Sequence, residues 1–176
     1  MIPSMKLFAI LIGGDVAGAN LELHDVRFAV AERIEDTYDQ LRREWWGTPA
    51  SLHLDCWAEL TGVDGHTITL APEPFTGPQK LYFIHLGGYD GSFNEAHQNL
   101  FLVADSAQRA KARAIASVNG WKTPHRDTLF EIDKIINLSG LAEQQSLHVH
   151  LQPGGAEGQP SFVCNYRKIG LKLREA

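Results

Sequence analysis

Cysteine is scarce in this sequence of 176 residues, which contains only Cys56 and Cys164. Two cysteines are too few for the disulfide framework of a small secreted domain. A chain of this length buries about 70% of its unfolded surface, so its fold needs no covalent staple. Cys56 lies in an apolar segment, where we expect a small buried thiol, and neither cysteine is predicted to be a nucleophile.

Long apolar runs and an excess of positive charge are also missing. No segment approaches the roughly 20 apolar residues that cross a bilayer, and the short apolar stretch near the N-terminus is too brief for a signal peptide. Lysine and arginine number 16 against 21 aspartate and glutamate residues, for a net charge of −5. Binding to nucleic acid would require a clustered basic face. We therefore expect a cytoplasmic protein with neither a membrane nor a nucleic-acid partner.

The sequence also lacks the short motifs of the commonest serine hydrolases, nucleotide hydrolases and redox proteins, namely a Gly-x-Ser-x-Gly elbow, a Walker loop and a Cys-x-x-Cys pair. Self-similarity is present instead, because residues 6–32 recur with small gaps as residues 80–105. The matched pairs include Lys6/Lys80, Ile10/Ile84, Gly13/Gly87, Gly14/Gly88, Glu22/Glu95, His24/His97, Phe28/Phe101, Trp46/Trp121, Pro49/Pro124, His53/His125, Asp55/Asp127 and Glu59/Glu131. Such a repeat predicts one structural unit used twice.

The doubled pattern resembles an uncharacterised bacterial family, domain of unknown function 1543. The features shared with it are a Lys-Leu apolar strand ending in Gly-Gly, a Glu-x-His strand, a helix ending in Trp, and His-x-Asp. The resemblance covers residues 5–152 and implies one or two repeats per chain. It implies no activity, so no catalytic residues follow from it. The second copy departs from the first where Gln98 replaces Asp25.

Each copy has the hydrophobic pattern of a ββαββ unit. In the first copy we expect strands at 6–12 and 21–31, a helix at 34–46, and strands at 52–60 and 67–70. In the second copy the helix is expected at 106–119. The sequence thus predicts an α+β protein of two tandem, pseudo-symmetric ββαββ repeats, residues 1–72 and 79–153, in one compact body.

Residues 154–176 form a C-terminal extension that has no partner in the first copy. Within it, residues 162–166 have the pattern of an extra strand, and a basic tail follows. We expect this extension to cover a sheet edge or to mediate self-association.

Paired glycines, Gly13 with Gly14 and Gly87 with Gly88, end the two strands that we expect to be central. Glycine is favoured where the backbone needs positive φ or close approach. A glycine pair can also cradle an anion, but the Gly-x-Gly-x-x-Gly pattern of nucleotide sites is absent. We predict a simple turn or bulge at both places.

Histidine and carboxylate side chains are the candidate site residues. They are Glu22, His24, His53 and Asp55 in the first copy, and Glu95, His97, His125 and Asp127 in the second. Strict alternation along a strand places Glu-x-His on the apolar face and His-x-Asp on the outward face, beside Glu59 and opposite Cys56 and Ala58. The two pairs would then meet only at strand ends or between the copies.

Three functions are compatible with these residues. The first is binding of a small anionic ligand or a divalent metal ion at the cleft between the two repeats, since histidine with carboxylates suits Zn²⁺, Mn²⁺ or Fe²⁺. The second is a metal-assisted or His/carboxylate hydrolase, which further needs an open coordination position. The third is a non-catalytic interaction module that forms a homodimer, in which each pair is a structural hydrogen bond duplicated along with the fold.

Overall fold

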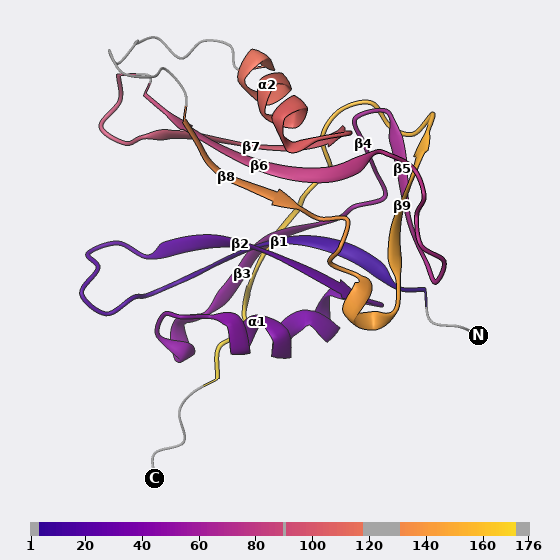
Figure 1. Cartoon of the computed structure of the whole chain (residues 1–176). Coiled ribbons are helices and arrows are strands. Elements are labelled where there is room, and N and C mark those ends of the chain that lie inside the picture. The colour runs from indigo at the N-terminus through magenta and orange to yellow at the C-terminus, as the bar shows by residue number, and fades with distance from the viewer. Residues whose placement is uncertain (1–3, 90, 118–130, 172–176) are drawn as a thin grey trace. The chain divides into compact units, whose positions relative to one another are not determined.

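The computed structural model describes residues 4–89, 91–117 and 131–171, with the backbone alone described at 131–133 (Figure 1). The chain divides into two compact units. Unit 1 consists of residues 1–61 and 160–176, and unit 2 consists of residues 62–159. Helices and antiparallel sheets occur in an α+β arrangement, as predicted. No helix among the described residues is long and apolar enough to cross a membrane.

Unit 1 is built on a four-stranded antiparallel sheet. Its strands, in the order β10-β3-β1-β2, are Val163–Lys168, His53–Glu59, Lys6–Gly14 and Leu23–Ala31. The central strand β1 is buried along nearly its whole length, as its continuous apolar run predicts. Strand β10 confirms the extra strand expected in the C-terminal extension, and it pairs along the edge of β3.

One face of this sheet packs against two consecutive helical segments (Figure 1). The single helix expected at 34–46 is instead a 3-10 helix, η1 (Ile34–Thr37), followed by the α-helix α1 (Tyr38–Glu44). A further 3-10 turn, η2 (Pro49–Ser51), leads into β3. The core residues on this face include Phe8, Ile10, Ile12, Ile34, Leu41, Trp45 and Leu54. Each fully buried side chain of this kind contributes about 1.5–3 kcal/mol.

A β-bulge interrupts β3 at Asp55. Successive residues of β1 face Leu54 and Cys56, so Asp55 is the extra residue on β3. The bulge reverses the alternation of side chains along the strand. His53, which faces Gly13, therefore shares a face of the sheet with Cys56. The prediction from strict alternation, which placed His53 and Cys56 on opposite faces, is wrong for this reason.

Unit 2 contains two three-stranded antiparallel sheets. One has the order β7-β6-β8, with strands Ala96–Ala104, Lys80–Gly88 and Glu131–Asn137. The α-helix α2 (Ala107–Ser117) packs on it through Ala110 and Ala114. The other has the order β4-β5-β9, with strands Gly62–Val63, His66–Ala71 and His148–Pro153. The 3-10 turn η3 (Glu143–Gln145) precedes β9.

The strand register corrects the residue pairing that the sequence suggested for β3 and β8. Strand β8 also contains a bulge, in which Asp133 is the extra residue, and Glu131 faces Gly87. Relative to the central strand, Glu131 therefore holds the backbone position that His53 holds beside Gly13. The sequence comparison had instead matched His53 with His125, Asp55 with Asp127 and Glu59 with Glu131. Residues His125 and Asp127 lie outside the described residues.

The turn between β4 and β5 is a two-residue Asp-Gly hairpin turn. Asp64 and Gly65 have φ values of 53° and 74°, the positive values that this two-residue turn requires. The Asp64 carboxylate accepts hydrogen bonds from the Val103 backbone N–H at 2.8 Å and from both terminal nitrogens of Arg113 at 2.8 and 2.6 Å. This carboxylate thereby joins the hairpin to β7 and α2.

We predict that Arg113→Ala lowers the free energy of unfolding by about 1–2 kcal/mol, because it removes a bidentate pair with a largely buried carboxylate. Arg109→Ala is the matched control on the same helix. The Arg109 ion pair with Asp105 is exposed, so its loss should cost less than about 0.5 kcal/mol. Urea unfolding measures both values, and equal losses would contradict a structural role for the Asp64 contact.

Candidate metal site

Four of the predicted site residues converge at one end of the unit 1 sheet. Glu22 immediately precedes β2, His24 lies at its start, His53 begins β3, and Asp55 is the bulge residue. His24 Nε2 lies 3.0 Å from Asp55 Oδ2 and 3.6 Å from Glu22 Oε1. His53 Nε2 lies 3.5 Å from Asp55 Oδ1 and 3.8 Å from Glu22 Oε2. The Glu-x-His and His-x-Asp pairs thus meet at strand ends.

Gly13 makes room for this convergence. His24 and His53 face Gly13 from the two neighbouring strands, on the face of the sheet away from α1. A Cβ atom on Gly13 would lie 2.7 Å from His24 Cδ2 and 2.8 Å from His53 Nε2. Since real Cβ atoms essentially never approach other heavy atoms so closely, the two imidazoles occupy space that glycine alone leaves free.

The prediction of turns at the glycine pairs is therefore wrong. Gly13 and Gly14 are the last residues of β1, and Gly87 and Gly88 are the last residues of β6. All four are paired in the sheet ladders. The part of the prediction that concerned close approach is correct for Gly13 and also for Gly14, whose Cβ would lie 2.9 Å from the ring of Trp45.

The orientation of His53 is fixed by its surroundings. Its side chain is only 5% exposed, and its Nδ1 lies 3.1 Å from the carbonyl oxygen of Ser51. A carbonyl can only accept a hydrogen bond, so Nδ1 is the donor in this contact and Nε2 is the ring nitrogen that faces the carboxylates. The ring of Tyr166 on β10 covers this imidazole at a centroid distance of 4.8 Å. Donation from the second ring nitrogen to a backbone carbonyl is a common way in which proteins orient histidine ligands.

The Asp55 carboxylate is the group of the cluster with a buried oxygen that lacks a hydrogen bond. Its Oδ2 atom is buried and accepts no hydrogen bond, although His24 Nε2 lies 3.0 Å away. Burying a carboxylate oxygen without a donor costs free energy. A cation held between the carboxylates and the imidazole nitrogens would remove that cost.

The spacing of the donors fits a metal ion. One donor atom each from Glu22, His24 and His53 lie within 4.8 Å of one another. Around a tetrahedral ion with bonds of about 2.0–2.2 Å, neighbouring donors lie about 3.3–3.6 Å apart. The four nitrogen–oxygen distances run from 3.0 to 3.8 Å, and in each carboxylate one oxygen lies nearer His24 and the other nearer His53.

The corresponding residues of unit 2 form a different arrangement. His97 faces Gly87, and its Nε2 lies 3.5 Å from Glu95 Oε2. The ring of His97 stacks on His85 at a centroid distance of 4.7 Å. Sequence reasoning did not single out His85, although a histidine inside an otherwise apolar strand was a signal. Of the four predicted residues of the second copy, Glu95 and His97 are brought together.

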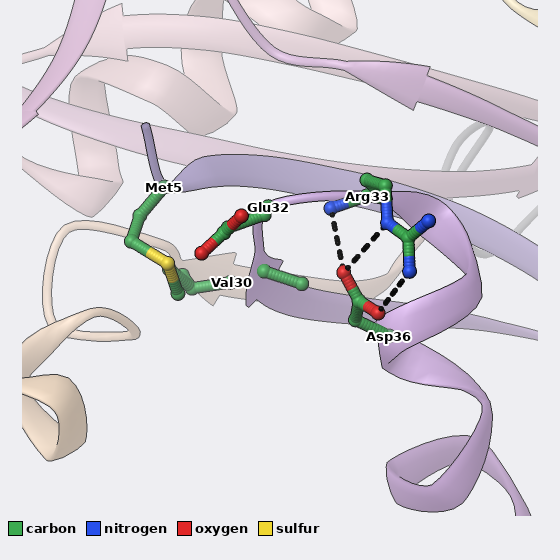
Figure 2. Close-up of a pocket in the computed structure, with 6 residues that line it drawn as sticks. Met5, Val30, Glu32, Arg33 and Asp36 are labelled. Carbon is green, nitrogen blue, oxygen red and sulfur yellow. Dashed lines mark hydrogen bonds and ion pairs between the residues drawn. The ribbon is translucent and has the colours of Figure 1, made fainter. Parts of the chain in front are cut away.

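A cavity of about 530 Å³ lies elsewhere in unit 1 (Figure 2). It is lined by Met5, Val30, Ala31, Glu32, Arg33 and Asp36. Its position is at the opposite end of the β1–β2 pair from His24, since Ala31 faces Lys6 whereas His24 faces Gly13. Arg33 donates to Asp36 from Nε at 3.3 Å and from Nη2 at 3.0 Å, so the two groups are already paired. Because it lies at the other end of these strands, the cavity is separate from the histidine cluster.

The two cysteines lie beside the cluster and opposite each other. Cys56 on β3 faces Cys164 on β10, a proximity that their separation in the sequence concealed. Burial above all, and then the neighbouring Cys164, raises the pKa of the Cys56 thiol to about 11. Cys164 is exposed and Cys56 is half-buried. Cys164 is therefore the thiol that reagents in solution meet first.

Comparison with known proteins gives the family. Protein Il1583 from Idiomarina loihiensis, known from its crystal structure, is 31% identical to this chain, with a TM-score of 0.67. The match covers 94% of this chain and 97% of that chain. The chain belongs to the same family as Il1583. Residues 19–70, which include all four cluster residues, match a family described as Domain of Unknown Function (DUF1543). This is the family that the motifs resemble, and the match lies within the first of the two predicted copies. No curated protein matches the chain.

We predict that Gly13→Ala lowers the free energy of unfolding by about 1–3 kcal/mol, because the added methyl group overpacks the space between the two imidazoles. Gly62→Ala is a suitable control, since its Cβ would find its nearest atoms at 3.4 Å, an ordinary contact. Chemical unfolding should show a cost within about 1 kcal/mol for that variant. A Gly13→Ala protein as stable as the control would mean that the imidazoles do not need this space.

Proposed function

We propose that this protein binds one divalent transition-metal ion through Glu22, His24, His53 and Asp55. The observation that carries this proposal is the buried Asp55 Oδ2, which accepts no hydrogen bond and lies 3.0 Å from an imidazole nitrogen. The orientation of His53 supports it, because the contact of Nδ1 with the Ser51 carbonyl turns Nε2 toward the carboxylates, where it could bind a metal ion. A cation would be bound by all four side chains at once.

The donor set favours Zn²⁺, Mn²⁺ or Fe²⁺ over other ions. Imidazole nitrogens suit these transition metals, whereas Mg²⁺ and Ca²⁺ are bound mainly by oxygen atoms. Two histidines with two carboxylates supply both neutral and anionic ligands. The carboxylates would balance the charge of a divalent ion, since each carries one negative charge when ionised.

This proposal modifies two expectations drawn from the sequence. All four residues belong to the first predicted repeat and to unit 1, so no residue of the second repeat is required for binding. A metal ion is also favoured over a small anionic ligand. The backbone of the paired glycines is engaged in the sheet ladders, and two carboxylates in the cluster would repel an anion.

The second candidate function is metal-assisted hydrolysis. The side chains of His24 and Glu22 are 40% and 50% exposed, so one side of the proposed ion would face solvent. Glu22 makes the longest contacts in the cluster and is suited to act as a general base instead of a ligand. Lys168 faces His53 in the β3–β10 register and would attract a negatively charged substrate.

We also propose that the chain arose from two tandem ββαββ copies, with boundaries at 1–72 and 79–153. The same strand order around the central strands β1 and β6 supports this. Support also comes from the bulges, since Asp55 and Asp133 are the extra residues at matching places in the register. In this duplication, His53 at the first position of β3 corresponds to Glu131 on β8. Among the described residues, only the first copy therefore has histidines on both strands that flank the central strand.

The proposed metal site is tested by elemental mass spectrometry on protein purified without a histidine tag. We expect about one zinc, manganese or iron ion per chain, lost on treatment with chelator and restored on reloading. His53→Ala and Asp55→Asn should weaken binding at least ~100-fold, because each removes a ligand. Circular dichroism would establish that the variants remain folded.

His150→Ala is the matched control for this experiment. His150 Nε2 lies 2.7 Å from the backbone carbonyl of Glu73 in unit 2, so its removal should leave the metal content unchanged. Unchanged affinity in a folded His53→Ala protein would contradict the assignment of ligands. Failure of the wild-type protein to retain any of the three metals after loading would contradict metal binding altogether.

A further inference from the structure

Cys56 and Cys164 form a cross-strand pair. They are direct partners in the antiparallel register of β3 and β10. Residues directly opposed in such a ladder have Cα atoms about 4.5–5.5 Å apart, which lies inside the range of about 4.4–6.8 Å that disulfides span. Both thiols are free in this structure. Little backbone movement is therefore needed to bring the two sulfur atoms to bonding distance.

A covalent link between the two cysteines would hold the edge strand β10 to β3. Strand β10 is an edge strand, and residues 163–166 are exposed. Its side-chain anchor is Arg167, which donates to Glu35 at 2.6 Å and to the Tyr38 hydroxyl at 2.9 Å. That anchor lies on the face of the sheet that carries α1. Cys164 lies on the other face, where Tyr166 covers the ring of His53.

We propose that Cys56 and Cys164 are a redox site, in which hydrogen peroxide or an organic hydroperoxide converts the two thiols into an intrachain disulfide joining β10 to β3. The proposal is independent of the metal site, because it needs only the two sulfur atoms and the oxidant. The bond would also affect the cluster, because it would fix the position of β10 and hence of Tyr166, whose ring packs on His53.

The reaction balances with one molecule of hydrogen peroxide. The exposed Cys164 sulfur, as thiolate, attacks one peroxide oxygen and breaks the O–O bond. Cys164 becomes a sulfenic acid, and the departing hydroxide takes up the thiol proton as water. The Cys56 sulfur then attacks the Cys164 sulfur, the S–O bond breaks, and the second hydroxide leaves as water with the Cys56 proton. Two thiols and one peroxide give one disulfide and two waters.

The test uses the full chain, first reduced and desalted, with and without chelator treatment. Limited hydrogen peroxide should lower the mass of the monomer by about 2 Da and remove both free thiols, and dithiothreitol should reverse both changes. Tryptic mapping should recover the peptide that contains Cys56 linked to the peptide that contains Cys164. The same result in chelator-treated protein would separate this chemistry from the proposed metal site.

Cys56→Ser and Cys164→Ser are the matched controls. Neither variant can form the intrachain bond, and each should instead gain oxygen on its remaining cysteine or form a disulfide-linked dimer. The proposal is overturned if the wild-type protein accumulates sulfinic acid at Cys164 or intermolecular dimers while the linked peptide is missing. Because Cys164 is exposed, its substitution leaves the fold intact and the comparison interpretable.

Discussion

The missing side chain at Gly13 is the constraint on which the arrangement in unit 1 depends. Two imidazoles from neighbouring strands meet over this residue, and a single methyl group would collide with both. The bulge at Asp55 then brings a carboxylate to the same place, because it adds one residue to β3 between Leu54 and Cys56. The missing side chain of Gly13 on β1 and the extra residue Asp55 on β3 together produce the cluster.

Within this cluster, His53 has a hydrogen-bond partner, whereas one oxygen of Asp55 has none. An ordinary surface group of polar residues does not leave a buried carboxylate oxygen without a donor. The His53 ring is buried, oriented by a backbone carbonyl and covered by Tyr166. Exposed ion pairs such as Arg33 with Asp36 satisfy each other with direct hydrogen bonds. Asp55 does not reach that state, since one of its oxygens is buried without a donor. The physical case for a cation rests on this difference.

Much of the fold followed from local sequence patterns, because strands, helices and the Asp64 turn depend on residues that are close in the chain. The extra C-terminal strand was predictable for the same reason. The bulges could not be predicted in this way, because the sequence of β3 does not show which of its residues has no partner on β1. That one-residue uncertainty sent His53 to the wrong face. The sequence comparison misaligned the second copy for a different reason, since Glu131, six residues beyond His125, lies in the position assigned to His125 and only the long-range strand pairing shows this. The opposition of Cys56 and Cys164 arises only from long-range pairing.

The division of the chain into units has a consequence for the order in which the protein can be completed on the ribosome. Unit 2 is a continuous segment, residues 62–159, inserted between the two parts of unit 1. Strand β3 gains its partner β10 only after that whole segment has been synthesised. Until then, β3 presents an open edge to other nascent chains. Unit 2 can complete its sheets as soon as residue 159 has been synthesised, whereas unit 1 is complete only after β10 has been added.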